Sequence, residues 1–184
     1  MKKISYWCLV GFICAGMGMS LAQSGGQQSA GAQRMQERIS REVHHELVML
    51  PQLTIFDNLQ YKVDGNKVTI LGQVRNAILK DSAQNVVKKI EGVEQVDNQI
   101  EVLPASPSDD RTRLAVAHAL FGNDSPLFRY SMGSVPPIHI VVKNGHVALE
   151  GVVDSQADKD LAYMKANGVP GVFSVENHLQ VQKS

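Results

Sequence analysis

The sequence predicts an α+β protein of two tandem αββαβ units, each a small mixed three-stranded sheet with two helices packed on one face. The first observation is a repeat: a shift of 79 residues aligns 61–102 with 140–181 without a gap, and 12 of the 42 aligned positions are identical. The second is the order of periodicities in each copy, which is helical, alternating, helical and alternating. The third is a proline-rich stretch between the copies.

The repeated residues are mostly valines and glycines, and no histidine or serine recurs at an aligned position. Valine and glycine set strand packing and chain turns, whereas reactive side chains carry catalysis. A repeat that keeps the first kind and loses the second favours a binding or structural module over an enzyme.

The N-terminal segment, residues 1–22, predicts a secretory signal peptide. Lys2 and Lys3 precede an apolar run, and Ser20-Leu21-Ala22 supplies small residues before a cut ahead of Gln23. An uncleaved membrane anchor is the alternative, which the shortness of the apolar run disfavours. Both cysteines of the chain lie in this segment, so the exported protein is expected to have no disulfide.

The rest of the chain divides by composition. Residues 23–33 are Gly, Ser, Ala and Gln without apolar periodicity and predict a flexible leader. Unit 1 is expected over 34–103, a linker over 104–108 and unit 2 over 109–182. Without the two signal lysines, 16 basic residues face 18 acidic ones, a net charge of −2. That balance argues against a nucleic-acid partner, which normally requires a basic domain.

Unit 1 begins with an amphipathic helix, because apolar residues recur every fourth position. Its inward positions are Met35, Ile39, Val43 and Leu47. A hairpin follows with its turn at 64–66, and Asn76 is placed to cap a second helix. A last strand is expected from Val96 to Val102.

Unit 2 repeats this order. Its first helix, from about Asp109, is expected to face inward with Leu114, Ala117 and Leu120. The dipeptide Asn144-Gly145 is the strongest short hairpin signal, and Ser155 opens a capping box for the second helix. The final strand is expected over 174–182. With the first two strands antiparallel, a crossover helix brings the last strand in parallel to a neighbour.

Two spaced patterns combine these positions. They are Val68-x-Ile70-x-Gly72-x-Val74 with Gly92-Val93-x-x-Val96-x-Asn98, and Val147-x-Leu149-x-Gly151-x-Val153-Asp154-Ser155 with Gly171-Val172-x-x-Val175-x-Asn177. Both resemble the BON domain, named for bacterial osmotically inducible periplasmic and nodulation proteins. The match is closer in unit 2, because unit 1 has Arg75-Asn76 in place of Asp-Ser and Glu91 in place of Pro.

The resemblance implies a periplasmic, phospholipid- or envelope-binding module associated with membrane integrity and osmotic stress, with no enzymatic activity and no cofactor. The shared residues themselves have structural explanations. Gly72 and Gly151 fall mid-strand, where a bulge or a helix crossing overhead is expected. Gly92 and Gly171 lie between helix and strand, a position that favours positive φ. Asn98 and Asn177 are expected to hydrogen-bond a neighbouring loop.

Metal binding and catalysis have little support. The six histidines lack the helical or Cys/His spacing of a metal site, although His139 and His146 flank one hairpin and could approach each other across it. The sequence has no Gly-x-Ser-x-Gly elbow and no phosphate-cradling glycine-rich loop. We therefore expect no metal and no catalytic residue.

Membrane or partner contact is the favoured use of two features. Arg34, Arg38 and Arg41 share a face of the first helix, although interleaved glutamates favour an ordinary solvated surface. In unit 2, the segment 122–137 is longer than its counterpart, and apolar and aromatic side chains around an arginine suit a membrane interface. The candidate contact residues are Arg111, Arg113, Leu127, Phe128, Arg129, Tyr130 and Met132.

Two functions remain open, together with a weaker third one, an accessory part of a larger secreted assembly. One is a periplasmic protein that associates with anionic phospholipid or the envelope and supports it under stress. The other is a protein-binding or chaperone-like adaptor that uses 122–137 or a strand edge. The segment 122–137 is equally compatible with a loop that covers its own core.

Overall fold

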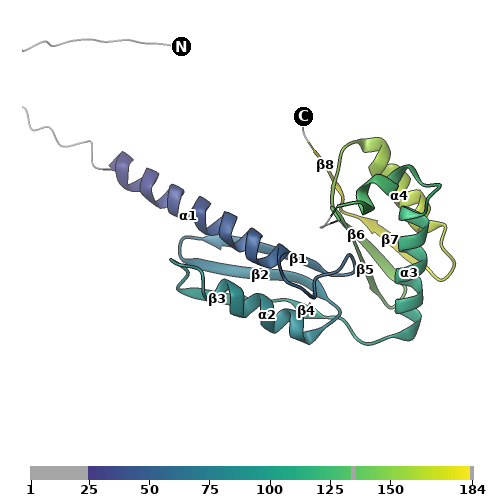
Figure 1. Ribbon diagram of the computed structural model, residues 1–184, viewed down its shortest axis with the longest axis horizontal. Coiled ribbons are helices and arrows are strands. Elements are labelled where there is room, and N and C mark those ends of the chain that lie inside the picture. The colour runs from purple at the N-terminus through teal and green to yellow at the C-terminus, as the bar shows by residue number, and fades with distance from the viewer. Residues whose placement is uncertain (1–24, 134–135, 183–184) are drawn as a thin grey trace, which may run out of the picture.

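The computed structural model describes residues 25–133 and 136–182. Two αββαβ units follow one another along the long axis, unit 1 toward the N-terminus and unit 2 toward the C-terminus (Figure 1). The predicted fold class is confirmed. The predicted signal peptide, residues 1–22, lies outside the described residues.

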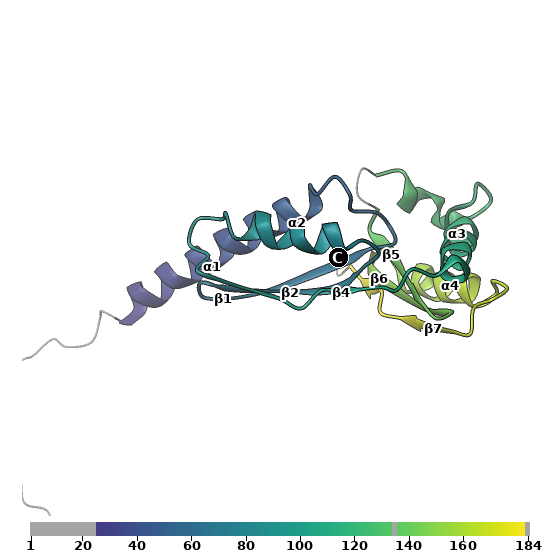
Figure 2. The same ribbon diagram turned by 90° about the horizontal axis from the view of Figure 1, so that it is seen from below.

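In unit 1, β1 pairs antiparallel with β2, and β3 and β4 both pair with β2 in parallel. The elements are α1 Gly25–Val48, β1 Asn58–Asp64, β2 Lys67–Val74, α2 Ala77–Val87, β3 Gln95–Asn98 and β4 Glu101–Val102. Both helices cover the same face of the sheet, and the N-terminal turns of α1 project beyond it (Figure 2).

Unit 2 has the same topology, with β5 antiparallel to β6 and both β7 and β8 parallel to β6. The elements are α3 Pro107–Phe121, a 3₁₀ helix η1 Pro126–Ser131, β5 Ile138–Lys143, β6 His146–Val153, α4 Gln156–Asn167, β7 Ser174–Asn177 and β8 Gln180–Val181. Segment η1 has no counterpart in unit 1 within the residues that the structure describes.

The last strand of each unit is interrupted at the repeated asparagine. Asn98 Oδ1 accepts a hydrogen bond from the Ile100 amide at 3.2 Å, which bends the chain between β3 and β4. Its Nδ2 donates to the Lys80 carbonyl of α2 at 3.0 Å, and Asn177 donates to the Lys159 carbonyl of α4 at 2.8 Å. The predicted loop partner is therefore wrong, because the asparagine fastens the last strand to the crossover helix.

The mid-strand glycines have positive φ, +114° at Gly72 and +118° at Gly151. A Cβ at Gly151 would lie 2.0 Å from the Pro137 carbonyl oxygen on the neighbouring chain segment. The neighbouring backbone therefore excludes a side chain here, and the expected explanation by a bulge or a crossing helix is wrong. The register is continuous through Gly72, and beyond Gly151 the Val152 amide still donates to the Pro137 carbonyl. Gly92 and Gly171 both have φ of +90°, as predicted.

Each unit has its own hydrophobic core under its two helices. Ile39, Val43 and Leu47 of α1 are buried as predicted, whereas Met35 is 44 % exposed. On α3, Leu120 is buried and Ala117 packs against the core as predicted, but Val116 is buried where Leu114 was expected, and Leu114 is 63 % exposed. This difference follows from the buried polar residues of this helix, which the apolar pattern alone does not reveal.

Two boundaries differ from the predictions. The leader expected to be flexible over 23–33 is helical from Gly25, despite its three helical glycines, because lengthening an existing helix avoids the cost of nucleating a new one. The linker expected over 104–108 ends earlier, since Pro107 occupies the first turn of α3 and Ser106 caps it. Proline suits this position, where its missing N–H removes no helical hydrogen bond.

The loop before β1 joins the two units. Ile55 and Phe56 of unit 1 pack against the core of unit 2. The Ile55 carbonyl accepts a hydrogen bond from the Ile140 amide of β5 at 2.7 Å. Arg75 lies over the Phe56 ring and donates to Asp110 of unit 2 at 3.0 Å. Unit 2 is thus completed by side chains of unit 1.

Candidate functional site

Segment η1, at the centre of the predicted contact region, is half core and half surface. Leu127 is fully buried and Tyr130 is 7 % exposed, and both belong to the unit 2 core. Phe128 and Met132 are 37 % and 75 % exposed. The segment therefore covers its own core and also presents two apolar side chains to solvent, and their contact with a membrane or a partner stays a prediction.

A polar cluster fixes η1 to the start of α4. The Tyr130 hydroxyl accepts from the Asp154 amide at 2.8 Å and donates to Asp158 at 3.1 Å. Arg129 bonds Asp158 at 2.7 Å, and its guanidinium lies 4.6 Å from the centre of the Tyr130 ring. Ser155 caps α4 as predicted and also donates to Asp158. The charge of Arg129 is therefore already paired.

The cluster changes the acidity of its members. Desolvation acts to raise the pKa of Asp158, but hydrogen bonds from Ser155, Tyr130 and Arg129 outweigh it, so this pKa lies below its usual value. Burial raises the pKa of Tyr130. Asp158 is thus a carboxylate at neutral pH that holds the segment in place.

The other two predicted arginines lie elsewhere. Arg113 is 2 % exposed and bonds Asp110 and the Val142 carbonyl of β5, so it is a buried structural residue. Arg111 is exposed near the start of α3, at the opposite end of that helix from η1. The seven candidates therefore do not form one surface. Of the seven, only Phe128, Arg129 and Met132 lie together at η1 and are exposed to solvent.

The end of unit 2 near Arg111 contains an aromatic residue that was not predicted. Asp109 accepts hydrogen bonds from the amides of Asn144 and Gly145, which brings α3 to the hairpin tip. Phe173 lies against Gly145 and is 77 % exposed. The repeat carries a signal for it, since Phe173 aligns with Glu94 and an aromatic residue in a turn has no core function.

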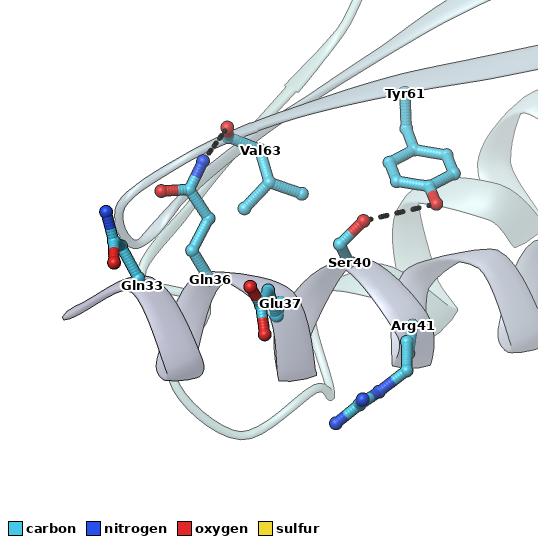
Figure 3. Close-up of a pocket in the computed structure, with 7 residues that line it drawn as sticks. All are labelled: Gln33, Gln36, Glu37, Ser40, Arg41, Tyr61 and Val63. Carbon is cyan, nitrogen blue, oxygen red and sulfur yellow. Dashed lines mark hydrogen bonds between the residues drawn. The ribbon is translucent and has the colours of Figure 1, made fainter. Parts of the chain in front are cut away.

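The basic face predicted on α1 is also divided. Arg38 bonds Glu42 and the Glu91 carbonyl, whereas Arg34 is exposed. Arg41 lines a groove of about 770 Å³ that runs between α1 and the outer edge of β1 (Figure 3). In this groove Gln36 donates to the Val63 carbonyl at 2.9 Å and Ser40 bonds the Tyr61 hydroxyl at 3.3 Å.

A second cleft, of about 590 Å³, continues along β1 from Tyr61 toward unit 2. Leu47, Val48, Leu53 and Leu59 form its apolar wall on unit 1, and Pro137 and Val152 lie on the side of unit 2. His139, Glu150 and His178 supply polar groups from the unit 2 sheet. Tyr61 lines both spaces, so together they follow β1 from Val63 to Asn58.

The two hairpin histidines do not approach each other. His139 pairs with Glu150 across the sheet and His146 with Lys143, which places them at opposite ends of the hairpin. Among residues 25–133 and 136–182, no cluster of three His, Cys, Asp or Glu side chains could hold a metal ion. Over the same residues no helix is long and apolar enough to cross a membrane.

Comparison with known proteins agrees with the repeat. The sequence matches the BON domain over residues 36–104 and again over 109–183. It is 31 % identical over 134 residues to osmotically-inducible protein Y of Escherichia coli (strain K12), an alignment that covers 68 % of this chain and 62 % of that protein.

Among solved structures, the chain is similar to CdsD, a structural protein of the type III secretion system of Chlamydia trachomatis, with 13 % identity and a TM-score of 0.31 over 80 % of this chain and 93 % of that one. A structure of the C-terminal domain of CdsD gives 12 % identity and a TM-score of 0.32 over 78 % and 96 %. The two matches to the BON domain, over 36–104 and 109–183, together span nearly all of units 1 and 2. We conclude that this chain belongs to the BON domain family, with two copies of the domain in tandem.

Proposed function

We propose that this protein is a non-enzymatic periplasmic protein that associates with anionic phospholipid at the cell envelope and supports the envelope under osmotic stress. Family membership and the similarity to an osmotically inducible protein support this proposal. The observation that carries it is η1, where Phe128 and Met132 face solvent on a base held by buried Leu127 and Tyr130.

The physical argument rests on exposed apolar side chains with a rigid base. Transfer of Phe128 and Met132 into the interfacial region of a bilayer removes apolar surface from water at little cost in ordering, because η1 is already fixed. Arg129 lies between them in the sequence and is already paired with Asp154 and Asp158. A lipid phosphate would have to compete with these two carboxylates for its positive charge. We therefore expect an electrostatic contribution that is smaller than the apolar one.

The test is flotation of the protein from Gln23 onward with vesicles of phosphatidylcholine or of phosphatidylglycerol. We expect binding to the anionic vesicles that decreases, without vanishing, between about 0.01 M and about 0.15 M salt, as the Debye length falls from about 30 Å to about 8 Å. Joint replacement of Phe128→Ser and Met132→Ser should weaken binding at least about tenfold.

Phe173→Ser is the matched control, because Phe173 is as exposed as Met132 but lies at the other end of unit 2. If the control variant loses binding and the η1 variant retains it, the contact belongs to the end that contains Arg111. Absence of flotation with either vesicle at low salt would refute phospholipid binding.

A protein-binding or adaptor role is the second candidate function. One specific observation favours it: β1 is an edge strand whose outer side lies along a groove rather than against another strand.

A further inference from the structure

The outer edge of β1 offers backbone groups to a partner. The carbonyls of Ile70 and Val74 on β2 accept hydrogen bonds from the β3–β4 side, so the alternate residues of β2 face β1. Leu71 is opposite Gln60 in that register. Gln60 and Leu71 therefore form a pair that exchanges two backbone hydrogen bonds, and the residues that alternate with Gln60 along β1 direct their N–H and C=O groups away from β2. These outward residues are Leu59, Tyr61 and Val63.

The Gln36 side chain confirms this direction, because it reaches the Val63 carbonyl from α1. The Tyr61 backbone has no such partner: within the described residues, its amide has no hydrogen-bond acceptor outside the sheet. An exposed edge of this kind is a template for pairing that natural proteins normally cover.

Unit 2 shows how the equivalent edge is covered. The 79-residue shift places Tyr61 on Ile140 and Val63 on Val142. On β5 the Val142 carbonyl accepts from the Arg113 side chain, as that of Val63 does from Gln36. The Ile140 amide, however, donates to the carbonyl of Ile55, which lies in a turn from Thr54 to Asp57 in the loop of unit 1. That segment also inserts Ile55 and Phe56 against the unit 2 core.

The groove along β1 has the shape and lining that such a segment requires. One wall is a stripe of α1 that changes from polar at Gln36 and Ser40 to apolar at Leu47 and Val48. The other wall is the β1 edge, and Figure 3 shows Tyr61 and Val63 facing α1 across the space. Pro137 and Val152 of unit 2 close one end of the groove. The remaining space suits a single polypeptide segment better than a folded domain.

We infer that the β1 edge groove is a docking site for a polypeptide segment bearing neighbouring apolar side chains, which hydrogen-bonds the outward backbone groups of Leu59 and Tyr61 as the turn at Ile55 bonds the Ile140 amide of β5. This gives the second candidate function a specific site. Its pairing edge belongs to unit 1 and no η1 residue lines the groove, so its failure leaves the lipid proposal untouched, and the reverse also holds.

The test uses a synthetic peptide with the sequence of residues 50–58, the segment that covers β5, and a scrambled peptide of the same composition. Amide NMR spectra of the protein from Gln23 onward are followed during titration. We expect the native peptide alone to shift the Leu59 and Tyr61 amides and to slow hydrogen exchange of Tyr61 at least about tenfold.

Two variants locate the contact. Ser40→Trp fills the groove beside Tyr61 and should weaken peptide binding at least about tenfold, whereas His45→Trp, on an exposed position of α1 outside the groove, should leave it unchanged. Leu59→Pro deletes an outward N–H at a sheet edge, where proline is tolerated, and should also weaken binding. Circular dichroism establishes that each variant is folded.

Four results would overturn the inference. The first is the absence of shifts on β1, and the second is shifts confined to Ile140, which would mean that the peptide displaces the covering segment of unit 2. The third is a response of β1 to a lysophospholipid but not to the peptide. The fourth is dimerisation in sedimentation experiments with the same β1 shifts, which would assign the edge to a second copy.

Discussion

At the scale of single residues, the repeated glycines and asparagines hold each sheet and its crossover helix together. Gly151 lets the chain pass close to the Pro137 carbonyl, and Asn177 ties the end of β7 to α4. Both contacts recur in unit 1 at Gly72 and Asn98. The residues that best identify the family thus have backbone functions.

Gly151→Ala is expected to destabilise the protein by about 3 kcal/mol, because it combines a φ of +118° with a Cβ placed 2.0 Å from a carbonyl oxygen. Urea unfolding measures the change. Gly31→Ala is the control: nothing lies within 4 Å of its Cβ position on exposed α1, so we expect no loss of stability and a gain of up to about 1 kcal/mol. Equal effects at the two positions would contradict this explanation.

Tyr130→Phe is expected to cost about 1–2 kcal/mol, since the Asp154 amide loses its acceptor and Asp158 loses one of its hydrogen bonds. The pKa of Asp158 should rise as well, because the Tyr130 hydroxyl is one of the groups that lower it. Urea unfolding and carboxyl NMR titration measure the two effects. An unchanged Asp158 titration would show that Ser155 and Arg129 suffice.

At the scale of elements, η1 explains the extra length of unit 2 before its first strand. Ser125 caps this segment, and one side of it enters the core while the other faces solvent. The division follows the 3₁₀ repeat, in which residues three apart share a side, as Leu127 and Tyr130 do.

Leu127→Ala is therefore expected to destabilise unit 2 by about 3 kcal/mol, as for other fully buried leucines. Phe128→Ser should cost less, about 1 kcal/mol, because its ring is 37 % exposed and does not belong to the unit 2 core. Thermal unfolding of both variants distinguishes the two sides of η1. Similar losses for the two would mean that Phe128 also packs as core.

At the scale of the whole molecule, unit 1 supplies part of the unit 2 core. Small domains without disulfides bury little apolar surface, and Ile55 and Phe56 add to what unit 2 buries. Association of the two units is thus built into the loop before β1.

Phe56→Ala is expected to destabilise unit 2 by about 1–2 kcal/mol, a reduced figure because the ring is only partly buried. Hydrogen exchange should accelerate in β5 and β6 and remain unchanged in β2. Met49→Ala, at a 66 % exposed position in the same connection, is the control. Uniform acceleration in both sheets would indicate one cooperative core instead.

The joint between the units is also expected to respond to acid. Burial lowers the pKa of His139 and outweighs the opposing effects of Asp57 and Glu150, while its Nδ1 is buried without a hydrogen-bond partner. The unfolded chain therefore binds this proton more readily than the folded one, so stability is full above the ordinary pKa of 6.5 and falls as the pH drops below it.

His139→Gln should flatten this dependence. Urea unfolding between about pH 7 and about pH 5 measures the slope of stability against pH. This pH interval spans the ordinary pKa of a histidine. The other titratable groups lining the adjoining cleft are His44, His178 and Glu150. A slope that persists in the variant would contradict the assignment to His139.

The sequence by itself determined the fold class, the two units, the helix caps at Asn76 and Ser155 and the turns at Gly92 and Gly171. These depend on local backbone preferences and on periodicities that a single segment already expresses. The repeat also predicted that both units share one topology, because the same pattern of residues occurs in each of them.

Only the tertiary structure decided which side chains of the candidate site reach solvent. Leu127 and Tyr130 carry the same apolar signal as Phe128, and Arg113 the same charge as Arg111. Contacts with α4, β5 and Asp158 nevertheless bury Leu127, Tyr130 and Arg113, whereas Phe128 and Arg111 stay exposed. The same holds for the β1 groove, since the free edge of Tyr61 depends on where the loop around Ile55 docks. Such contacts join residues far apart in the chain, and no local pattern records them.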